Sequence, residues 1–324
     1  MADFRKGPRY LLVRPGAIGD AIVTLPAVQA IQAQGAAVEL VVGQGAAALL
    51  RRRCAADAVH SYEEPRWANL FARKPPAHLG AFLQTFDAII LYLAATRMDL
   101  ASRLAAALGT PVIGWPSLPD EAHPLPISDH LQQPLLELGL CPRSAAPRLT
   151  LTDKDRARAN AWWADRQVSP GQEVIVALHP GSGSARKNWP LANFEAVAAH
   201  FERYGAGTLV IAGPAEAGRL DQLATWKIHR LSVAHGLNLA QIGALLTDCA
   251  CFVGNDSGIA HLSAALGVPT VVLFGPTDAR VWAPRGPTVR IIKSGDADEK
   301  SPMEGISVSH VAQAVASIMG VAGT

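Results

Sequence analysis

An aspartate and two glycines stand directly after the first apolar run of the sequence. Residues 10–14 read as a strand, and Gly16, Gly19 and Asp20 follow before a helical pattern begins. The glycines permit a tight turn, which places Asp20 near the start of the helix, at the strand end where α/β proteins bind ligands. A carboxylate there can act as a general base. It can equally be a first-turn aspartate that interacts with the helix dipole, and the residues alone leave the two interpretations even.

The segment 253–261, VGNDSGIAH, places a glycine-rich polar turn between an apolar run and an alanine-rich helical pattern. Unpaired N–H groups at a helix start attract phosphate, and Gly258 lets a ligand approach the backbone. Asp256 and Ser257 add polar side chains, and His261 lies one helical turn further on the same side. The alternative interpretation is that Asp256 or Ser257 only caps the helix. A cap, however, requires neither His261 nor both glycines. The segment therefore favours a phosphate site.

A third loop, HPGSGSARKNWP at residues 179–190, also follows an apolar run and precedes a helical pattern. Ser182, Ser184 and backbone N–H groups can bind phosphate oxygens, while Lys187 supplies a positive charge. The spacing is not that of a Walker A loop. A Gly/Ser loop alone is more often an ordinary turn. Together with the loop around Asp256 at the same sheet edge, however, it forms a candidate diphosphate clamp.

Two acidic positions suggest contacts to a nucleoside. Glu216 follows the predicted strand 207–212, where it can hold the hydroxyls of a ribose, although a first-turn helix glutamate is an equal alternative. The segment GQGAAA at residues 43–48 fits a dinucleotide-binding pattern, with Glu63 and Glu64 about 20 residues further on. It follows the second strand of its sheet rather than the first. An ordinary strand-to-helix turn explains it, and we predict no cofactor.

The composition narrows the class of protein. A chain of 324 residues is longer than a single hydrophobic core usually grows. A net charge of +2 and basic runs of at most three residues exclude a nucleic-acid-binding surface. The four cysteines form no CxxC pair, which argues against a disulfide framework or structural zinc. There is no signal-peptide pattern and no apolar run of about 20 residues, so we expect a cytoplasmic protein.

Short apolar runs alternate with longer helical patterns, as in proteins with βαβ units and parallel sheets. The predicted strands are residues 10–14, 38–42, 58–60, 88–91 and 111–114, then 174–178, 207–212, 229–231, 251–253, 270–274 and 289–292. The proline-containing stretch 139–171, around a helix at 154–166, reads as a connection. We therefore predict two Rossmann-like, doubly wound α/β domains, residues 1–168 and 169–324, with a binding cleft between them. The last helix, 308–318, closes the second domain or packs back on the first.

Four segments resemble, in order and spacing, the glycosyltransferase family that includes the ADP-heptose:lipopolysaccharide heptosyltransferases: residues 14–31, 179–197, 212–216 and 254–278. The resemblance implies a GT-B fold and an inverting transfer that needs no metal, and no carboxylate pair for Mg²⁺ occurs among these motifs. It implies that Asp20 is the catalytic base. It also implies that the nucleotide-sugar donor is bound by Ser182, Gly183, Lys187, Glu216, Asp256, Ser257, Gly258 and His261.

The resemblance further implies the partners. They are ADP-heptose as donor and an anionic, lipid-linked inner-core oligosaccharide as acceptor, met by peripheral contact at the cytoplasmic face of the inner membrane. Candidate acceptor contacts are Arg66, Arg73, Lys74 and Arg97, although an ordinary solvated surface also carries such residues. Two other functions stay open: a sugar-nucleotide epimerase or hydrolase of the same fold, and a non-catalytic sugar-nucleotide-binding module. Asp20 beside an intact donor site speaks against the module.

Overall fold

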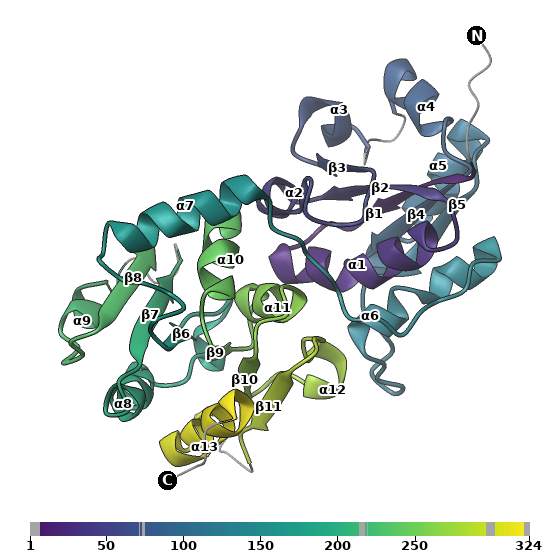
Figure 1. Ribbon diagram of the computed structural model, residues 1–324. Helices are drawn as coiled ribbons and strands as arrows, with labels where there is room; N and C mark the ends of the chain where they lie inside the picture. The colour runs from purple at the N-terminus through teal and green to yellow at the C-terminus, as the bar shows by residue number, and fades with distance from the viewer. Residues whose placement is uncertain are drawn as a thin grey trace. The chain divides into compact units, whose positions relative to one another are not determined.

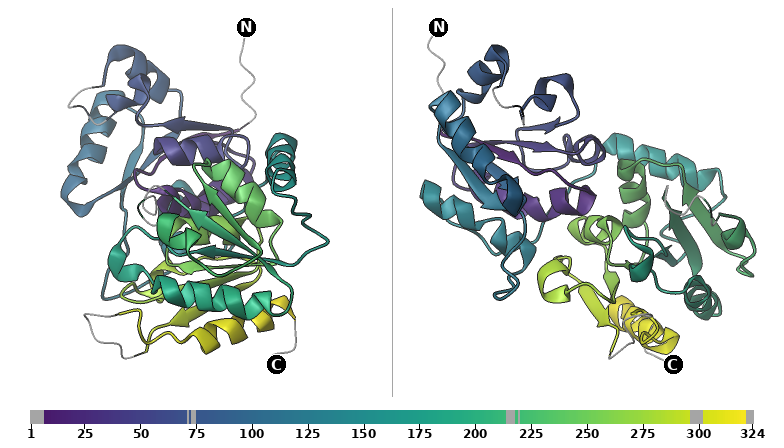
Figure 2. Two further views of the ribbon diagram at one scale, coloured as in Figure 1. Left: turned by 90° about the vertical axis from the view of Figure 1, so that its left-hand side faces the viewer. Right: turned by 180° about the vertical axis from the view of Figure 1, so that it is seen from behind.

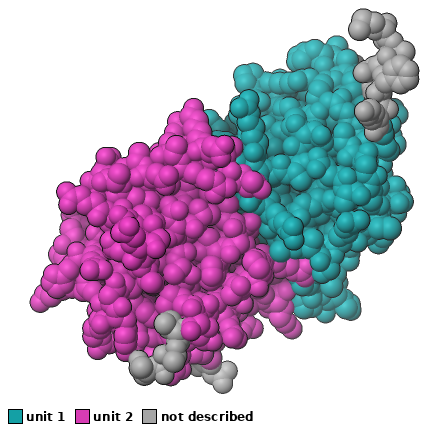
Figure 3. Space-filling view, in the orientation of Figure 1, with its two compact units in different colours: residues 1–149 teal, residues 150–324 magenta. Residues whose placement is uncertain are grey.

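The computed structural model describes residues 7–70, 72, 75–213, 218, 220–295 and 302–320. The chain divides into two compact units, residues 1–149 and 150–324 (Figure 3). Each unit contains one parallel β-sheet with helices packed around it (Figure 1). The predicted α/β class with two doubly wound sheets is therefore confirmed.

The sheet of unit 1 has five strands in the order β3-β2-β1-β4-β5. They are β1 (Arg9–Val13), β2 (Ala37–Val42), β3 (Ala58–Ser61), β4 (Ala88–Leu93) and β5 (Val112–Pro116). The chain moves outward from β1 to β3 and then returns to place β4 on the other side of β1. The loops that leave β1 and β4 therefore diverge, and a parallel sheet binds ligands at such a point, beside the carboxyl ends of the strands.

Helices cover both faces of this sheet. One face carries a core in which Trp67, Phe86 and leucines of the helices pack on β1 and β4. The α-helices of the unit are α1 (Ile18–Gln32), α2 (Gln44–Leu50), α3 (Pro65–Ala68), α4 (Ala77–Leu83), α5 (Asp99–Leu108) and α6 (Ile127–His130). Short 3-10 helices follow β4 and α6: η1 (Ala95–Arg97) and η2 (Gln133–Leu138). Residues 127–138 form two short helices rather than one, because Pro134 cannot donate the backbone hydrogen bond that a continuous helix needs.

The sheet of unit 2 has six strands in the order β11-β10-β9-β6-β7-β8. They are β6 (Ile175–His179), β7 (Gly207–Ala212), β8 (Leu231–His235), β9 (Cys251–Asn255), β10 (Thr270–Phe274) and β11 (Val289–Lys293). The chain reverses direction across the sheet between β6 and β9, which are hydrogen-bonded neighbours. The loops after β6 and β9 therefore lie at the ligand-binding position of a doubly wound sheet.

The helices of unit 2 bury both faces of its sheet. They are α7 (Asp153–Ala164), α8 (Leu191–Glu202), α9 (Leu220–Ala224), α10 (Leu239–Thr247), α11 (Gly258–Ala265), α12 (Ala279–Trp282) and α13 (Val308–Met319), with the 3-10 helix η3 (Ala185–Lys187) after β6. Helix α13 packs beside α8 on one face (Figures 1 and 2), where Val311 and Val315 enter the core. The last helix thus contributes to the core of unit 2.

The division between the units differs from the predicted boundary after residue 168. The structure divides after Leu149, so α7 belongs to unit 2. Its Trp163 is buried and donates a hydrogen bond from Nε1 to Oδ2 of Asp248, 2.9 Å away at the end of α10. The sequence pattern identifies α7 as a helix, but it does not reveal this packing on α10.

Candidate functional site

Asp20 lies at the carboxyl edge of the unit 1 sheet, in the first turn of α1. Its Oδ1 accepts a hydrogen bond from Nη2 of Arg14 at 2.7 Å, and its Oδ2 accepts one from the backbone N–H of Ala17 at 2.9 Å. Arg14 directly follows β1 and its side chain is only 4% exposed, whereas that of Asp20 is 26% exposed. The pair therefore presents a carboxylate to the surface and keeps the cation beneath it.

The turn between Arg14 and Asp20 requires glycine at position 16. Gly16 has a φ of +145°, and a β-carbon there would lie 2.5 Å from Oδ2 of Asp20. On the neighbouring strand, a β-carbon on Gly43 would lie 3.0 Å from the carbonyl oxygen of Gly16. Gly43 is the N-cap of α2 at an ordinary strand-to-helix turn and packs closely on the Asp20 loop, whereas a β-carbon on Gly45 would meet open space.

Two side chains near Arg14, Tyr92 and His130, have pKa values shifted in the direction that favours their neutral forms. Burial raises the pKa of Tyr92, whose hydroxyl donates to the carbonyl oxygen of Leu131 at 2.6 Å. Burial also lowers the pKa of His130, with a smaller contribution in the same direction from Arg14. For Arg14 itself, burial lowers the pKa more than the nearby Asp20 raises it. Burying the Arg14 guanidinium costs free energy, and Asp20 is its charged partner.

The structure describes two of the four candidate acceptor contacts, Arg66 and Arg97, and these lie on different elements. Arg97 is the last residue of η1, which follows β4. Strand β4 is a hydrogen-bonded neighbour of β1. Arg66 lies in α3, where its guanidinium stacks 3.6 Å from the centre of the Phe82 ring. Arg73 and Lys74 lie outside the described residues. Of the two described residues, Arg97 follows the strand next to β1, the strand that precedes Asp20.

In unit 2, the loops after β6 and β9 are joined by an ion pair between Lys187 and Asp256. The distance from Nζ to Oδ2 is 2.7 Å, although the residues are far apart in sequence. Here the carboxylate is the buried partner: the side chain of Asp256 is 8% exposed and that of Lys187 is 31% exposed. This edge therefore presents an ammonium group at the ligand-binding position of the sheet.

Asn255 fixes the geometry of these two loops, and the sequence analysis missed it. The residue is fully buried at the end of β9. Its Nδ2 donates to the carbonyl oxygen of Pro180 at 2.8 Å, and its Oδ1 accepts from the backbone N–H of Trp189 at 3.0 Å. Both ends of the Lys187 loop are thus tied to β9. The available signal was a polar residue in a buried strand, next to Asp256.

Ser257, rather than Asp256, is the N-cap of α11. Its hydroxyl accepts a long hydrogen bond, 3.4 Å, from the N–H of Ala260, and it also lies 3.2 Å from Nδ1 of His179. Asp256 is therefore free of the capping role and is committed to Lys187. Gly258 begins the helix, where the first N–H groups lack partners within it. Gly254 has a packing reason instead, because a β-carbon there would lie 2.6 Å from the Phe252 ring.

The remaining predicted donor residues differ in how well they are placed. The Ser182 hydroxyl lies 2.7 Å from both the Ser184 carbonyl oxygen and Oδ1 of Asn188, so it organises its own loop. Gly183 faces open space where a β-carbon would stand. His261 is buried in the first turn of α11. Glu216 lies outside the described residues.

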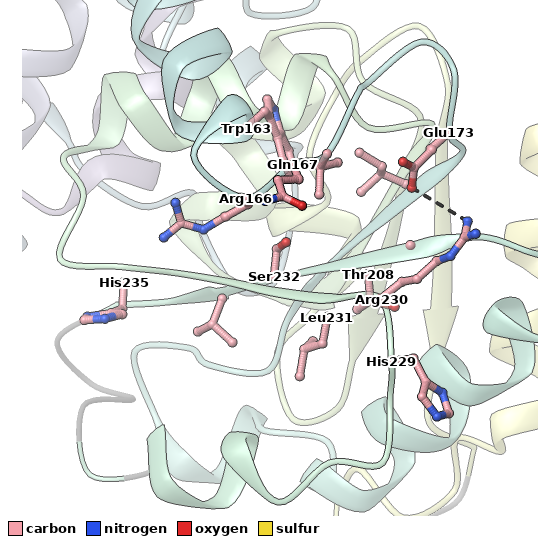
Figure 4. A pocket seen from close by; sticks show the side chains of 14 residues that line it. Trp163, Arg166, Gln167, Glu173, Thr208, His229, Arg230, Leu231, Ser232 and His235 are labelled. Atoms are coloured by element: carbon pink, nitrogen blue, oxygen red, sulfur yellow. Dashed lines mark ion pairs between the residues drawn. The ribbon is translucent and has the colours of Figure 1, made fainter.

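A pocket of about 630 Å³ lies elsewhere in unit 2 (Figure 4). It includes the first residues of β6 and β7, so it reaches the amino ends of these strands rather than the loops that carry Lys187 and Asp256. None of the predicted site residues that the structure describes lines it. Its Arg230 lies 3.7 Å from Glu173 and donates to the carbonyl oxygen of Gly205 at 3.0 Å. Its main cation is thus committed within the protein, and we assign no ligand to it.

Two further properties of the described residues bear on the membrane and on metal ions. No helix among them is both long enough and apolar enough to cross a membrane. No three or more His, Cys, Asp or Glu side chains in this part of the chain are grouped so that they could hold a metal ion. Positive charge at the two sheet edges comes from Arg14 and Lys187.

Sequence comparison identifies relatives of the chain. The family model of glycosyltransferase family 9 (heptosyltransferase) matches residues 129–309, more than half of the 324 residues. Lipopolysaccharide heptosyltransferase 1 of Pseudomonas aeruginosa is 36% identical over 112 residues, which are 34% of this chain and 31% of that protein. The match thus spans about a third of the length of this curated relative.

Solved structures share the whole fold. The glycosyl transferase family 9 protein of Veillonella parvula superposes with a TM-score of 0.81 at 18% identity, covering 98% of this chain and 99% of that one. The ADP-heptose lps heptosyltransferase II of E. coli gives a TM-score of 0.75 at 18% identity, covering 96% and 98%. These likenesses confirm the predicted GT-B fold.

Proposed function

The chain belongs to glycosyltransferase family 9, the heptosyltransferases, and on that premise we propose that it transfers a heptose from ADP-heptose to a sugar of the lipopolysaccharide inner core. The names of its relatives support both substrates: one is a lipopolysaccharide heptosyltransferase and another an ADP-heptose lps heptosyltransferase. The observation that carries the proposal is the exposed Lys187 ammonium, held by Asp256 beside the start of α11.

Unit 2 is the proposed donor-binding unit. A diphosphate at the switch between β6 and β9 meets the Lys187 ammonium and the unpaired N–H groups of α11, both of which favour negative charge. Asp256 is buried and keeps the ammonium in place at this edge of the sheet. Ser182 and Gly183 in the loop after β6, with Ser257 and His261 at the start of α11, complete the proposed donor site. Glu216 is proposed as the ribose contact.

Unit 1 is the proposed acceptor-binding unit, and Asp20 is the proposed base. The acceptor hydroxyl attacks the anomeric carbon of the heptose from the side opposite the diphosphate, so the configuration inverts. A carbon–oxygen bond forms to the acceptor, the bond to the diphosphate breaks, and the hydroxyl proton passes to Asp20. ADP leaves with the negative charge that Lys187 and the α11 N–H groups stabilise. These groups supply the stabilisation that a metal ion gives other transferases.

An anionic acceptor explains the candidate cations of unit 1. Arg97 is the best placed, because it follows the strand next to β1. Arg66, Arg73 and Lys74 come from the region after β3 and are proposed as more distant contacts. A lipid-linked acceptor places the protein at the cytoplasmic face of the inner membrane through peripheral contact.

The test is acceptor-dependent release of ADP. Purified protein is incubated with ADP-heptose, with and without a lipid A inner core that lacks the heptose, and both ADP and glycosylated product are measured. We expect ADP and product in equal amounts and only with the acceptor. Fast ADP release without acceptor would instead indicate a hydrolase or epimerase. In parallel, melting temperatures with ADP-, UDP- and GDP-sugars identify the donor, because a ligand that binds the native state raises the melting temperature.

A further inference from the structure

Burying the Arg14 side chain beneath Asp20 costs free energy. Arg14 has a relative exposure of 3%, and its Nε has no hydrogen-bond partner among the described residues. A buried ion pair seldom stabilises a fold more than apolar side chains of the same size would. An arginine that is left partly unsatisfied here is thus a poor choice for stability alone. This points to a role in the chemistry at the surface above it.

That role concerns the orientation of one carboxylate. Each Asp20 oxygen accepts one hydrogen bond from the protein: Oδ1 from Nη2 of Arg14 and Oδ2 from the backbone N–H of Ala17. Two donors from different parts of the turn fix the plane of the carboxylate as well as its position. The remaining lone pairs are left for a partner on the exposed side, since a carboxylate offers about four acceptor sites.

The burial of Arg14 excludes a direct contact with substrate. At 4% side-chain exposure the guanidinium cannot bind an acceptor, whereas Asp20 at 26% can. The other polar groups packed near Arg14 do not compete for it near pH 7: the Tyr92 hydroxyl is bonded to the carbonyl oxygen of Leu131, and His130 Nε2 lies 2.8 Å from that of Pro116. Arg14 therefore acts through Asp20.

We propose that Arg14 is a positioning residue that holds the Asp20 carboxylate in the orientation needed to accept the acceptor's proton. The inference rests on the proposed function, because it assumes that Asp20 is the base. A small displacement of a catalytic group can lower the rate by about 10²-fold, so loss of the Arg14 contact should appear in kcat. It should leave the KM for the donor unchanged, because the donor site belongs to unit 2.

The experiment is a double-mutant cycle on kcat. Arg14→Met should lower kcat by about 10- to 100-fold in the wild-type background. In the Asp20→Asn background the same substitution should cost less than about threefold, because residues that act as a unit are not additive. Arg14→Lys keeps the cation and should restore most of the rate. An equal loss in both backgrounds would overturn the inference.

Arg9→Met is the matched control. Arg9 lies at the other end of β1, where it forms an ion pair with Glu39. Its loss tests the effect of breaking a cation–carboxylate pair in the same sheet away from Asp20. We expect a lower melting temperature with kcat within about twofold of wild type. If Arg9→Met lowers kcat as much as Arg14→Met does, Arg14 has only a structural role.

Crystal structures separate this inference from the proposed function. If the wild-type protein transfers no heptose, the proposed function fails, and the orientation of Asp20 is then judged directly. In Arg14→Met the Asp20 carboxylate should leave the position in which it accepts from Ala17, while Arg14→Lys should keep it there. An unchanged carboxylate in Arg14→Met would contradict the positioning role whatever the activity.

Discussion

The carboxyl edges of the two sheets carry the same kind of ion pair with opposite exposure. At the unit 1 edge the cation is buried and the carboxylate is exposed, 4% against 26%. At the unit 2 edge the carboxylate is buried and the cation is exposed, 8% against 31%. Similar topology thus presents a negative group in one unit and a positive group in the other. Which partner is buried determines which charge faces the solvent at each edge, and therefore which chemistry that edge can perform.

The position of each residue along the chain explains the reversal. Arg14 comes directly after β1, and Asp256 comes directly after β9. In both units the residue at the strand end is the buried partner, because it continues the line of a central strand. The partner that follows or precedes it in a loop or helix is the exposed one. An arginine at one strand end and an aspartate at the other are enough to produce the two opposite surfaces.

The largest effect should come from Asp20→Asn. The amide keeps the shape of the carboxylate but cannot accept the acceptor's proton, so kcat should fall by about 10² or more. Turnover with a lipid A inner-core acceptor measures this, and the melting temperature is recorded on the same preparation. Asp153→Asn is the control, because Asp153 is an exposed first-turn aspartate of α7. If both variants keep normal turnover and lose only about 0.3–1 kcal/mol of stability, Asp20 merely favours its helix terminus.

The free energy of unfolding should depend on pH because of His179, the last residue of β6 at the unit 2 edge. Burial lowers the pKa of His179 to about 4 from its ordinary value of 6.5. Between these values the unfolded chain binds a proton that the folded chain does not, so stability falls as the pH falls from 6.5 towards 4. The loss between pH 7 and pH 5 should be about 2 kcal/mol.

Thermal unfolding at both pH values tests the His179 prediction. The variant His179→Gln should lose stability less steeply than wild type between pH 7 and pH 5. His78→Gln is the control for the loss of a histidine, since His78 is an exposed residue of α4. Equal slopes for wild type and His179→Gln would show that His179 already titrates in the folded protein near its ordinary pKa.

The smallest effect should come from chelation. If the exposed Lys187 and the N–H groups of α11 stabilise the departing diphosphate, EDTA should leave turnover within about twofold of the untreated rate. The measurement is the rate of ADP release before and after treatment with EDTA, followed by addition of Mg²⁺. A loss of activity that Mg²⁺ restores would assign the leaving-group stabilisation to a metal ion rather than to the unit 2 edge.

The sequence predicts much of this arrangement because local patterns determine it. Each of the eleven predicted strands overlaps an observed one, since apolar runs between helical patterns define parallel strands. The loops that carry Asp20, Lys187 and Asp256 follow from the same pattern. The Ser257 cap was one of two alternatives for its loop, and the structure assigns it to Ser257 alone.

What the sequence could not predict depends on contacts between distant residues. Lys187 and Asp256 meet only because β6 and β9 are neighbours in the sheet. Asn255 was missed because its two partners, Pro180 and Trp189, come from another loop. Arg14 is the first residue of the segment 14–31, but its burial beneath Asp20 is a property of the folded unit. Exposure of one partner and burial of the other is a property of the folded protein.

Calorimetric titration of ADP into two variants tests the division between the edges most directly. Lys187→Ala removes a charge-assisted contact worth about 1.5–3 kcal/mol, so its affinity for ADP should fall tenfold or more. Asp20→Asn should bind ADP with the affinity of wild type, because its carboxylate serves the acceptor. Both variants should melt below wild type, because each leaves a buried charge, Asp256 or Arg14, without its charged partner, so the titrations are run well below these melting temperatures. Unchanged ADP affinity in Lys187→Ala, or a tenfold loss in Asp20→Asn, would contradict the assignment of an exposed cation to the donor and an exposed carboxylate to the acceptor.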